Sequence, residues 1–168
     1  MEKKRKNTSN KIGQKFEDRV QKVCDELREN NICMLNKVPT DWKVIRNGGR
    51  IVSGFPVAQS KFVDFVGIYN GKSISIETKT TNNLTAFPLS NIKETQYEYF
   101  ITYHAMQGYG YYLIEFREHE KIFLVESMKV EDFRNNNTRK SIPYQWFLDN
   151  AIELDNKKIN FIDYIKVK

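Results

Sequence analysis

KFVDFVGIYNGKSISIETKT, which spans residues 61–80, predicts two β-strands joined by Asn70 and Gly71. An Asn-Gly pair between alternating apolar residues is a strong hairpin signal, because both residues readily adopt the positive φ angles of a type I′ turn. With these two residues as the turn, Tyr69 lies opposite Lys72. The pairing of every residue farther along the two strands is then fixed.

This register places Asp64 opposite Glu77, with Lys79 two residues farther on. Side chains in a strand alternate between two faces, so these three side chains are expected to share one face. A bulged three-residue turn would shift the pairing by one residue and separate them. The other face is mostly apolar and is expected to pack against the core. It carries Val63, Phe65, Gly67, Tyr69, Ile74, Ile76 and Thr78.

Two carboxylates opposed across a strand pair indicate a cation site. Their Cβ atoms would lie roughly 5 Å apart, where like charges destabilise the pairing. A Mg²⁺ ion between Asp64 and Glu77 would offset this repulsion, since proteins bind Mg²⁺ through one or two carboxylates together with water and phosphate oxygens. Lys79 would then hold an attacking water or offset charge on a phosphate. The alternative interpretation is an ordinary hairpin whose polar face is solvated.

The composition predicts one globular domain that is attracted to a polyanion. The chain has 168 residues, of which 40% are hydrophobic and 13% aromatic, and this suffices for one sizeable core. Its net charge of +6 favours a nucleic-acid partner. Residues 1–10 are predicted to be a basic flexible arm, which either follows phosphates or only aids solubility. Residues 11–168 are predicted to form a single domain.

Several other classes of protein are disfavoured by the sequence. Cys24 and Cys33 make neither a disulfide framework nor a zinc site, and His104 and His119 are too scattered for a metal cluster. No hydrophobic run has membrane-spanning length, and no signal peptide is found. We therefore expect a cytosolic protein that makes no membrane contact.

Residues 40–60 predict a second hairpin, which projects from the body of the protein. Two short apolar runs flank residues 47–49, an Asn-Gly-Gly turn. An ordinary surface hairpin with solvated cations fits the same pattern. The candidate DNA contacts on this segment are the cations Lys43, Arg46 and Arg50 and the apolar side chains Trp42 and Phe55.

A helix is predicted on each side of the two hairpins. The first covers residues 9–30, where apolar side chains recur every three or four residues. The second begins at a capping box of Asn91 and Glu94 and ends at Gly108. Gln96 lies on or near its apolar face, where the amide either points towards a metal cleft or is satisfied structurally. The remaining predicted elements are strands over 32–38, 109–116 and 121–126 and short helices over 127–133 and 143–148.

The sequence resembles a known class of nuclease. An Asp followed after twelve residues by Glu-Thr-Lys resembles the PD-(D/E)xK signature of the restriction-endonuclease-like fold. The order of the predicted elements and of several short matches resembles the RecU family of Holliday-junction resolvases, found in Gram-positive bacteria and their phages. These matches are residues 13–17, 37–40, 60–64, 69–71, 77–79, 87–92, Gln96 and 141–143.

The resemblance implies an α/β fold of the restriction-endonuclease type, with a mixed central β-sheet flanked by helices and a projecting hairpin, or stalk, over residues 40–60. It implies that Asp64 and Glu77 bind Mg²⁺, for which Mn²⁺ can substitute, that Lys79 is catalytic, and that Glu17 of the first helix assists. The residues expected to contact DNA are Lys37, Lys43, Arg46, Arg50, Lys61 and Gln96.

The function that the resemblance implies is Mg²⁺-dependent cleavage of four-way DNA junctions by a homodimer, in DNA recombination and repair, with host recombination proteins as further partners. The sequence departs from the family pattern in two places: Thr95 stands where the family usually has His, which concerns a supporting role beside the site, and the stalk is short, which concerns junction specificity more than cleavage. Two other functions compete, namely a related nuclease acting on duplex DNA and a catalytically idle DNA-binding module. The intact set of Asp64, Glu77 and Lys79 favours catalysis.

Overall fold

The computed structural model describes residues 2–39, 42–56 and 62–167. A six-stranded sheet forms its centre, in the order β1-β4-β5-β7-β8-β10. Only β5 and β7 pair in parallel within this sheet, and the other neighbours are antiparallel. The strands are β1 (Met34–Lys37), β4 (Phe65–Tyr69), β5 (Lys72–Thr81), β7 (Tyr109–Phe116), β8 (Lys121–Glu126) and β10 (Ile152–Leu154). The predicted α/β fold with a mixed central sheet is confirmed.

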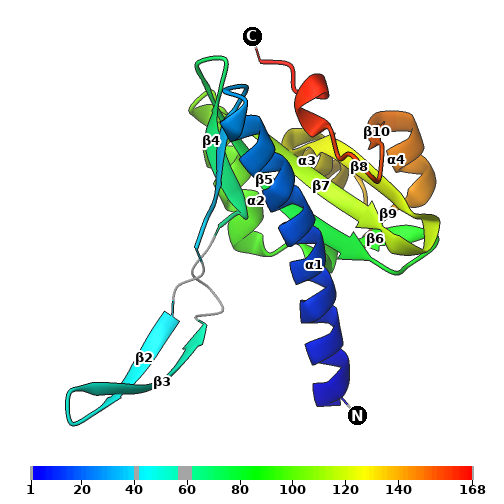
Figure 1. The fold of residues 1–168 in the computed structure, drawn as a ribbon. Coiled ribbons are helices and arrows are strands. Elements are labelled where there is room, and N and C mark those ends of the chain that lie inside the picture. The colour runs from blue at the N-terminus through cyan, green and yellow to red at the C-terminus, as the bar shows by residue number, and fades with distance from the viewer. Residues whose placement is uncertain (1, 40–41, 57–61, 168) are drawn as a thin grey trace.

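One face of the sheet is covered by α1 (Glu2–Glu29), which crosses it diagonally in Figure 1. Phe16, Val20 and Cys24 recur on one side of this helix, and all three are buried against the sheet. The helix begins at Glu2, so the backbone of the basic segment that was expected to form a flexible arm is helical. Lysine, arginine and glutamate are good helix formers, and they let α1 continue beyond the sheet.

The opposite face is covered by three helices, of which one lies at the right-hand edge of the sheet in Figure 1. They are α2 (Glu94–Ala105), α3 (Ser127–Asn136) and α4 (Tyr144–Asn150). Their buried side chains form a second, aromatic-rich core with Tyr112 and Phe116 of β7. A short two-stranded sheet of β6 (Ala86–Pro88) and β9 (Ser141–Pro143) holds the ends of this layer together. The structure also contains the 3-10 helices Leu89–Asn91, Arg117–His119 and Phe161–Tyr164.

The central hairpin has the register that the Asn-Gly turn predicts. Tyr69 pairs with Lys72 and Phe65 with Ile76, while Asn70 has a φ angle of 49° and Gly71 one of 74°. Gly67 permits the close approach of β1, since a Cβ atom there would lie 1.7 Å from the carbonyl oxygen of Met34. The Asn70-Gly71 turn therefore sets the pairing of β4 with β5, and the lack of a side chain at Gly67 lets β1 pair on the other edge.

Strand alternation stops before β4, and here the sequence-based prediction was wrong. Residues 62–64 are not part of the strand, and Val63 packs in the aromatic-rich core instead of sharing the α1 side with Phe65. Pairing with β5 ends at Phe65, so nothing in the ladder holds the preceding residues to a two-residue period.

A separate hairpin of β2 (Trp42–Asn47) and β3 (Arg50–Pro56) projects away from the body, as Figure 1 shows. The two strands pair only with each other, and Gly48 and Gly49 form the turn with positive φ angles. The projecting hairpin predicted over residues 40–60 is confirmed for its described part, residues 42–56.

The boundaries of α2 differ from the prediction. Its N-cap is Lys93, whose backbone N–H donates to Oε1 of Gln96, whereas Asn91 belongs to the preceding 3-10 helix. After Ala105 the left-handed residue is Gln107, with a φ angle of 63°. The predicted capping box has the right spacing but lies two residues too early in the chain, because the buried Gln96 decides which residue caps the helix. No helix within the described residues is long and apolar enough to cross a membrane.

Candidate active site

Asp64 and Glu77 form the centre of the candidate site, where β4 and β5 separate. Both carboxyl groups are buried, with exposed fractions of 4% for Asp64 and 3% for Glu77. The Oδ2 atom of Asp64 accepts hydrogen bonds from the backbone N–H of Thr78, at 2.9 Å, and from its hydroxyl, at 2.6 Å. The Asp64 carboxylate is therefore tied to the residue that follows Glu77, and not placed directly opposite Glu77 in a ladder.

The two oxygens of Glu77 have different surroundings. Its Oε1 atom lies 2.7 Å from Nζ of Lys79 and accepts a hydrogen bond of 2.6 Å from Nε2 of Gln96. Its Oε2 atom is buried and has no hydrogen-bond partner in the described part of the chain. A buried carboxylate oxygen without a partner is costly, and ligation of a cation would satisfy it.

The pKa of Glu77 is raised to about 7, mainly by burial and also by the nearby charge of Asp64. The ammonium group of Lys79 and the amide of Gln96 act in the opposite direction. Two acids in one desolvated place thus oppose each other's ionisation, and one lysine does not cancel this effect. A divalent cation would favour the ionised form of both.

Gln96 fixes the position of Glu77 from the side of α2. It is 4% exposed, and its Oε1 atom accepts the Lys93 backbone N–H at 3.1 Å while its Nε2 atom donates to Glu77. The sequence left open whether the Gln96 amide points towards a metal cleft or is satisfied structurally. The structure places this amide beside the acid pair. Gln96 was also predicted to contact DNA, but its amide is enclosed by protein.

Glu17 and Lys37 meet at the same end of the sheet. The Nζ atom of Lys37 lies 3.1 Å from a carboxylate oxygen of Glu17 and 3.6 Å from Asp18. The backbone continues the connection, since the N–H of Val38 donates to the carbonyl oxygen of Asp64 at 2.8 Å. Glu17 thus pairs with Lys37. Among the described residues, no group of three or more His, Cys, Asp or Glu side chains is arranged to hold a metal ion.

A family model for RecU, described as recombination protein U, matches residues 11–168. This chain belongs to the RecU family. A protein of Oceanobacillus iheyensis named Holliday junction resolvase RecU is 30% identical over 79% of this chain and 71% of its own length. A protein of Mycoplasmopsis pulmonis with the same name is 32% identical over 81% of this chain and 80% of its own. The family resemblance found in the sequence is confirmed.

The fold of this RecU-family chain is also similar to a solved structure of Hjc, a Holliday junction resolvase from Archaeoglobus fulgidus. The two chains are 14% identical, with a TM-score of 0.44 over 77% of this chain and 90% of the other.

The remaining predicted DNA contacts that the structure describes lie on the β2–β3 hairpin of this RecU-family chain. Lys43, Arg46 and Arg50 are exposed, as is the ring of Phe55. The hairpin therefore presents its cations to solvent. These cations belong to a segment of the sequence that precedes the buried acid pair. Lys61 and the side chain of Trp42 lie outside the described residues.

Two residues beside the acid pair were not predicted. Thr78 was expected to face the core, yet its hydroxyl holds Asp64. Tyr112 of β7 pairs in register with Glu77, and its buried hydroxyl has no partner among the described residues. Burial raises the pKa of Tyr112. The position of Thr78 between Glu77 and Lys79 could have indicated its place in the site. The position of Tyr112 beside Glu77 follows only from the parallel pairing of β5 with β7.

Proposed function

We propose that this chain is an endonuclease that resolves four-way DNA junctions by Mg²⁺-dependent hydrolysis of phosphodiester bonds. The observation that carries the proposal is the buried pair of Asp64 and Glu77 with Lys79 beside it. Membership of the RecU family and the resolvase names of its relatives support the choice of substrate.

The residues present fit a divalent cation. Asp64 and Glu77 would hold it, since the unpartnered Oε2 atom of Glu77 is a hard oxygen donor in a dry place. Two carboxylates match the ligand set that Mg²⁺ uses when water and substrate phosphate complete its shell. A bound Mg²⁺ ion supplies Lewis acidity towards the phosphate and lowers the pKa of a bound water.

The side chains around the acid pair have separate tasks in this mechanism. Thr78 orients the carboxylate of Asp64, and Gln96 orients that of Glu77. Lys79 positions the attacking water or stabilises the charge that develops on the phosphate. Because its ammonium lies 2.7 Å from Oε1 of Glu77, Lys79 is held close to the proposed cation site. Glu17 supports the site indirectly, by fixing Lys37 beside Phe65, the residue that follows Asp64.

Substrate selection would come from the surface and from symmetry. The exposed cations of the β2–β3 hairpin suit phosphate contacts, and the net charge of +6 favours DNA. A four-way junction has two-fold symmetry, which a homodimer with an isologous interface would match by presenting one site to each of two opposite strands. Host recombination proteins are proposed as further partners of such a dimer.

The decisive experiment is cleavage of a labelled, mobile four-way junction by the purified protein, with Mg²⁺ and with EDTA. We expect symmetric nicks near the crossover in Mg²⁺, none in EDTA, and none on a linear duplex of the same sequence. Mn²⁺ is expected to substitute for Mg²⁺. Equal cleavage of the duplex would instead identify a general duplex nuclease.

The Asp64→Asn variant tests the assignment of the acid pair. It is expected to bind the junction and to lose cleavage, because an amide still accepts the hydrogen bonds from Thr78 but is a poor ligand for Mg²⁺. Glu153→Gln is a matched control, since Glu153 makes an exposed ion pair with Lys121 at the opposite edge of the sheet, on β10 and β8. Full activity of Asp64→Asn would contradict the proposal, and junction binding without cleavage by the parent protein would indicate an idle binding module.

A further inference from the structure

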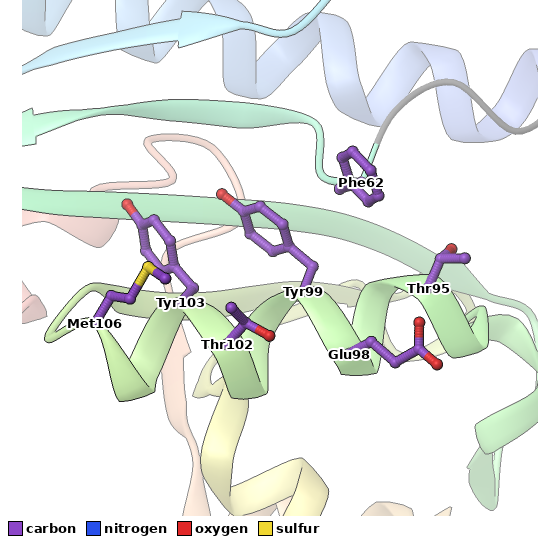
Figure 2. Close-up of a pocket in the computed structure, with 7 residues that line it drawn as sticks. All are labelled: Phe62, Thr95, Glu98, Tyr99, Thr102, Tyr103 and Met106. Carbon is purple, nitrogen blue, oxygen red and sulfur yellow. The ribbon is translucent and has the colours of Figure 1, made fainter.

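A groove with an aromatic wall runs along the outer side of α2, as Figure 2 shows. It has a volume of about 340 Å³. The rings of Phe62 and Tyr99 lie 5.8 Å apart with 14° between their planes, and those of Tyr99 and Tyr103 lie 5.3 Å apart with 19°. Three rings are therefore stacked almost in parallel at the protein surface.

This arrangement differs from that of the aromatic side chains in the core. There the rings of Phe100 and Tyr112 meet at 65° and those of Phe87 and Phe147 at 80°, the edge-to-face geometry that suits a packed interior. The surface stack ends instead on Phe62, whose side chain is 54% exposed. A flat aromatic face at the end of a stack is suited to receiving another flat ring.

The stack is held in place from the sheet. The hydroxyl of Ser75 donates to that of Tyr99 at 3.3 Å, and the hydroxyls of Ser73 and Tyr103 lie 2.5 Å apart. Both serines belong to β5, the strand that carries Glu77. Because the two tyrosine rings are fixed before any ligand arrives, little side-chain entropy would be lost on binding.

The exposed end of the stack lies at the candidate active site. Phe62 precedes Asp64 by two residues, and Thr95, which lines the groove, is adjacent to Gln96. Glu98 is the charged side chain in the lining, and it disfavours a phosphate there while it can accept hydrogen bonds from the amino group of a base. The chemistry of the groove thus favours a nucleobase over the DNA backbone.

We propose that Phe62, supported by Tyr99 and Tyr103, stacks on an unpaired nucleobase of the DNA substrate next to the scissile phosphate. This inference rests on the proposed nuclease function. Bases at a branch point are available for such a contact, because stacking and pairing are interrupted there. Aromatic stacking tolerates any base, so the contact would select for an unstacked base at the cut and not for a sequence.

The test compares Phe62→Leu, which keeps an apolar side chain but removes the ring, with Phe62→Tyr, which keeps the ring. Binding is measured in EDTA to four-way junctions that carry 2-aminopurine at single positions beside the crossover. We expect Phe62→Leu to weaken junction binding about tenfold and Phe62→Tyr to retain the parent affinity. The change in 2-aminopurine fluorescence that the parent causes near the cut should be lost in Phe62→Leu only. Ile101→Leu, an exposed apolar position of α2 that does not line the groove, is the control and should change neither quantity.

Two results would overturn this inference. One is unchanged junction affinity and unchanged fluorescence in Phe62→Leu. The other is a change of oligomeric mass in Phe62→Leu by sedimentation equilibrium, which would make the groove an interface between two copies of the chain. Because binding is measured in EDTA, the result does not depend on catalysis. Absence of junction cleavage by the parent protein in Mg²⁺ would therefore reject the proposed function separately.

Discussion

The two hairpins of this protein both turn through two residues with positive φ angles, but their environments are opposite. Each consists of two apolar strands joined through glycine, yet Phe65 and Ile76 of the β4–β5 hairpin are fully buried, whereas Val52 of the β2–β3 hairpin is 59% exposed. The first hairpin has β1 and β7 as neighbours and helices on both faces, and the second pairs only with itself. Burial here is a property of the neighbours and not of the strands.

This difference separates the two kinds of chemistry that a nuclease needs. The buried hairpin removes water from Asp64 and Glu77, and burial is the main cause of the raised pKa of Glu77. The exposed hairpin keeps Arg46 and Arg50 hydrated and able to meet phosphates. Catalytic groups gain from desolvation, while sequence-independent DNA contacts require exposure.

The largest expected effect is on stability, when equivalent truncations are made in the two hairpins. Phe65→Ala should lower the free energy of unfolding by about 3–5 kcal/mol, because a fully buried ring leaves a cavity. Val52→Ala should change it by no more than about 0.5 kcal/mol, since the side chain is solvated in the folded state. Urea denaturation of both variants measures this contrast, and equal losses would show that the projecting hairpin is buried in solution.

Glu77→Gln should lower cleavage of a four-way junction by more than about a hundredfold. Partners that merely orient a metal ligand contribute about 10–100-fold, so loss of a ligand should exceed this range. Junction affinity in EDTA should stay within about twofold of the parent value, as only the buried site is changed. Single-turnover cleavage and binding are measured in parallel, and a loss of binding equal to the loss of cleavage would place Glu77 in DNA contact.

Gln96→Leu should reduce cleavage by about tenfold or more, because the amide that fixes Glu77 from α2 is lost. The Mg²⁺ concentration needed for half-maximal cleavage should rise, a readout that general destabilisation would not move. Gln145→Leu, on the exposed side of α4, serves as the control for replacing a helical glutamine. An unchanged Mg²⁺ requirement in Gln96→Leu would mean that its role is confined to capping the helix.

The smallest effect is expected from a single cation of the projecting hairpin. Arg50→Ser should weaken junction binding without changing the cleavage rate of bound substrate, and it should reduce the slope of log affinity against log salt by about one. Arg139→Ser, which alters an exposed cation in the loop before β9, controls for the change in net charge. An identical salt slope in parent and Arg50→Ser would exclude a phosphate contact at this residue.

Much of the architecture was predictable, because its signals are local. Asn70 and Gly71 fixed the register of β4 with β5, and the spacing of Phe16, Val20 and Cys24 identified the buried side of α1. The order of the four helices and of the longer strands was predicted, as was the RecU family, whereas the short strands β6, β9 and β10 were not. The boundaries of α2 were not, since a contact between Gln96 and Lys93 decides where that helix begins.

The amino-acid sequence by itself determined the hairpin register, the membership of Glu77 and Lys79 in one site, and the segment that projects, because these follow from residues close together in the chain. Only the tertiary structure decided that Thr78 would hold Asp64, that Gln96 would hold Glu77, and that Lys37 would pair with Glu17. Those contacts join separate elements, and their geometry depends on how helices pack on each face of the sheet. A two-residue period ends where strand pairing ends, so the position of Asp64 outside the ladder could come only from the folded chain.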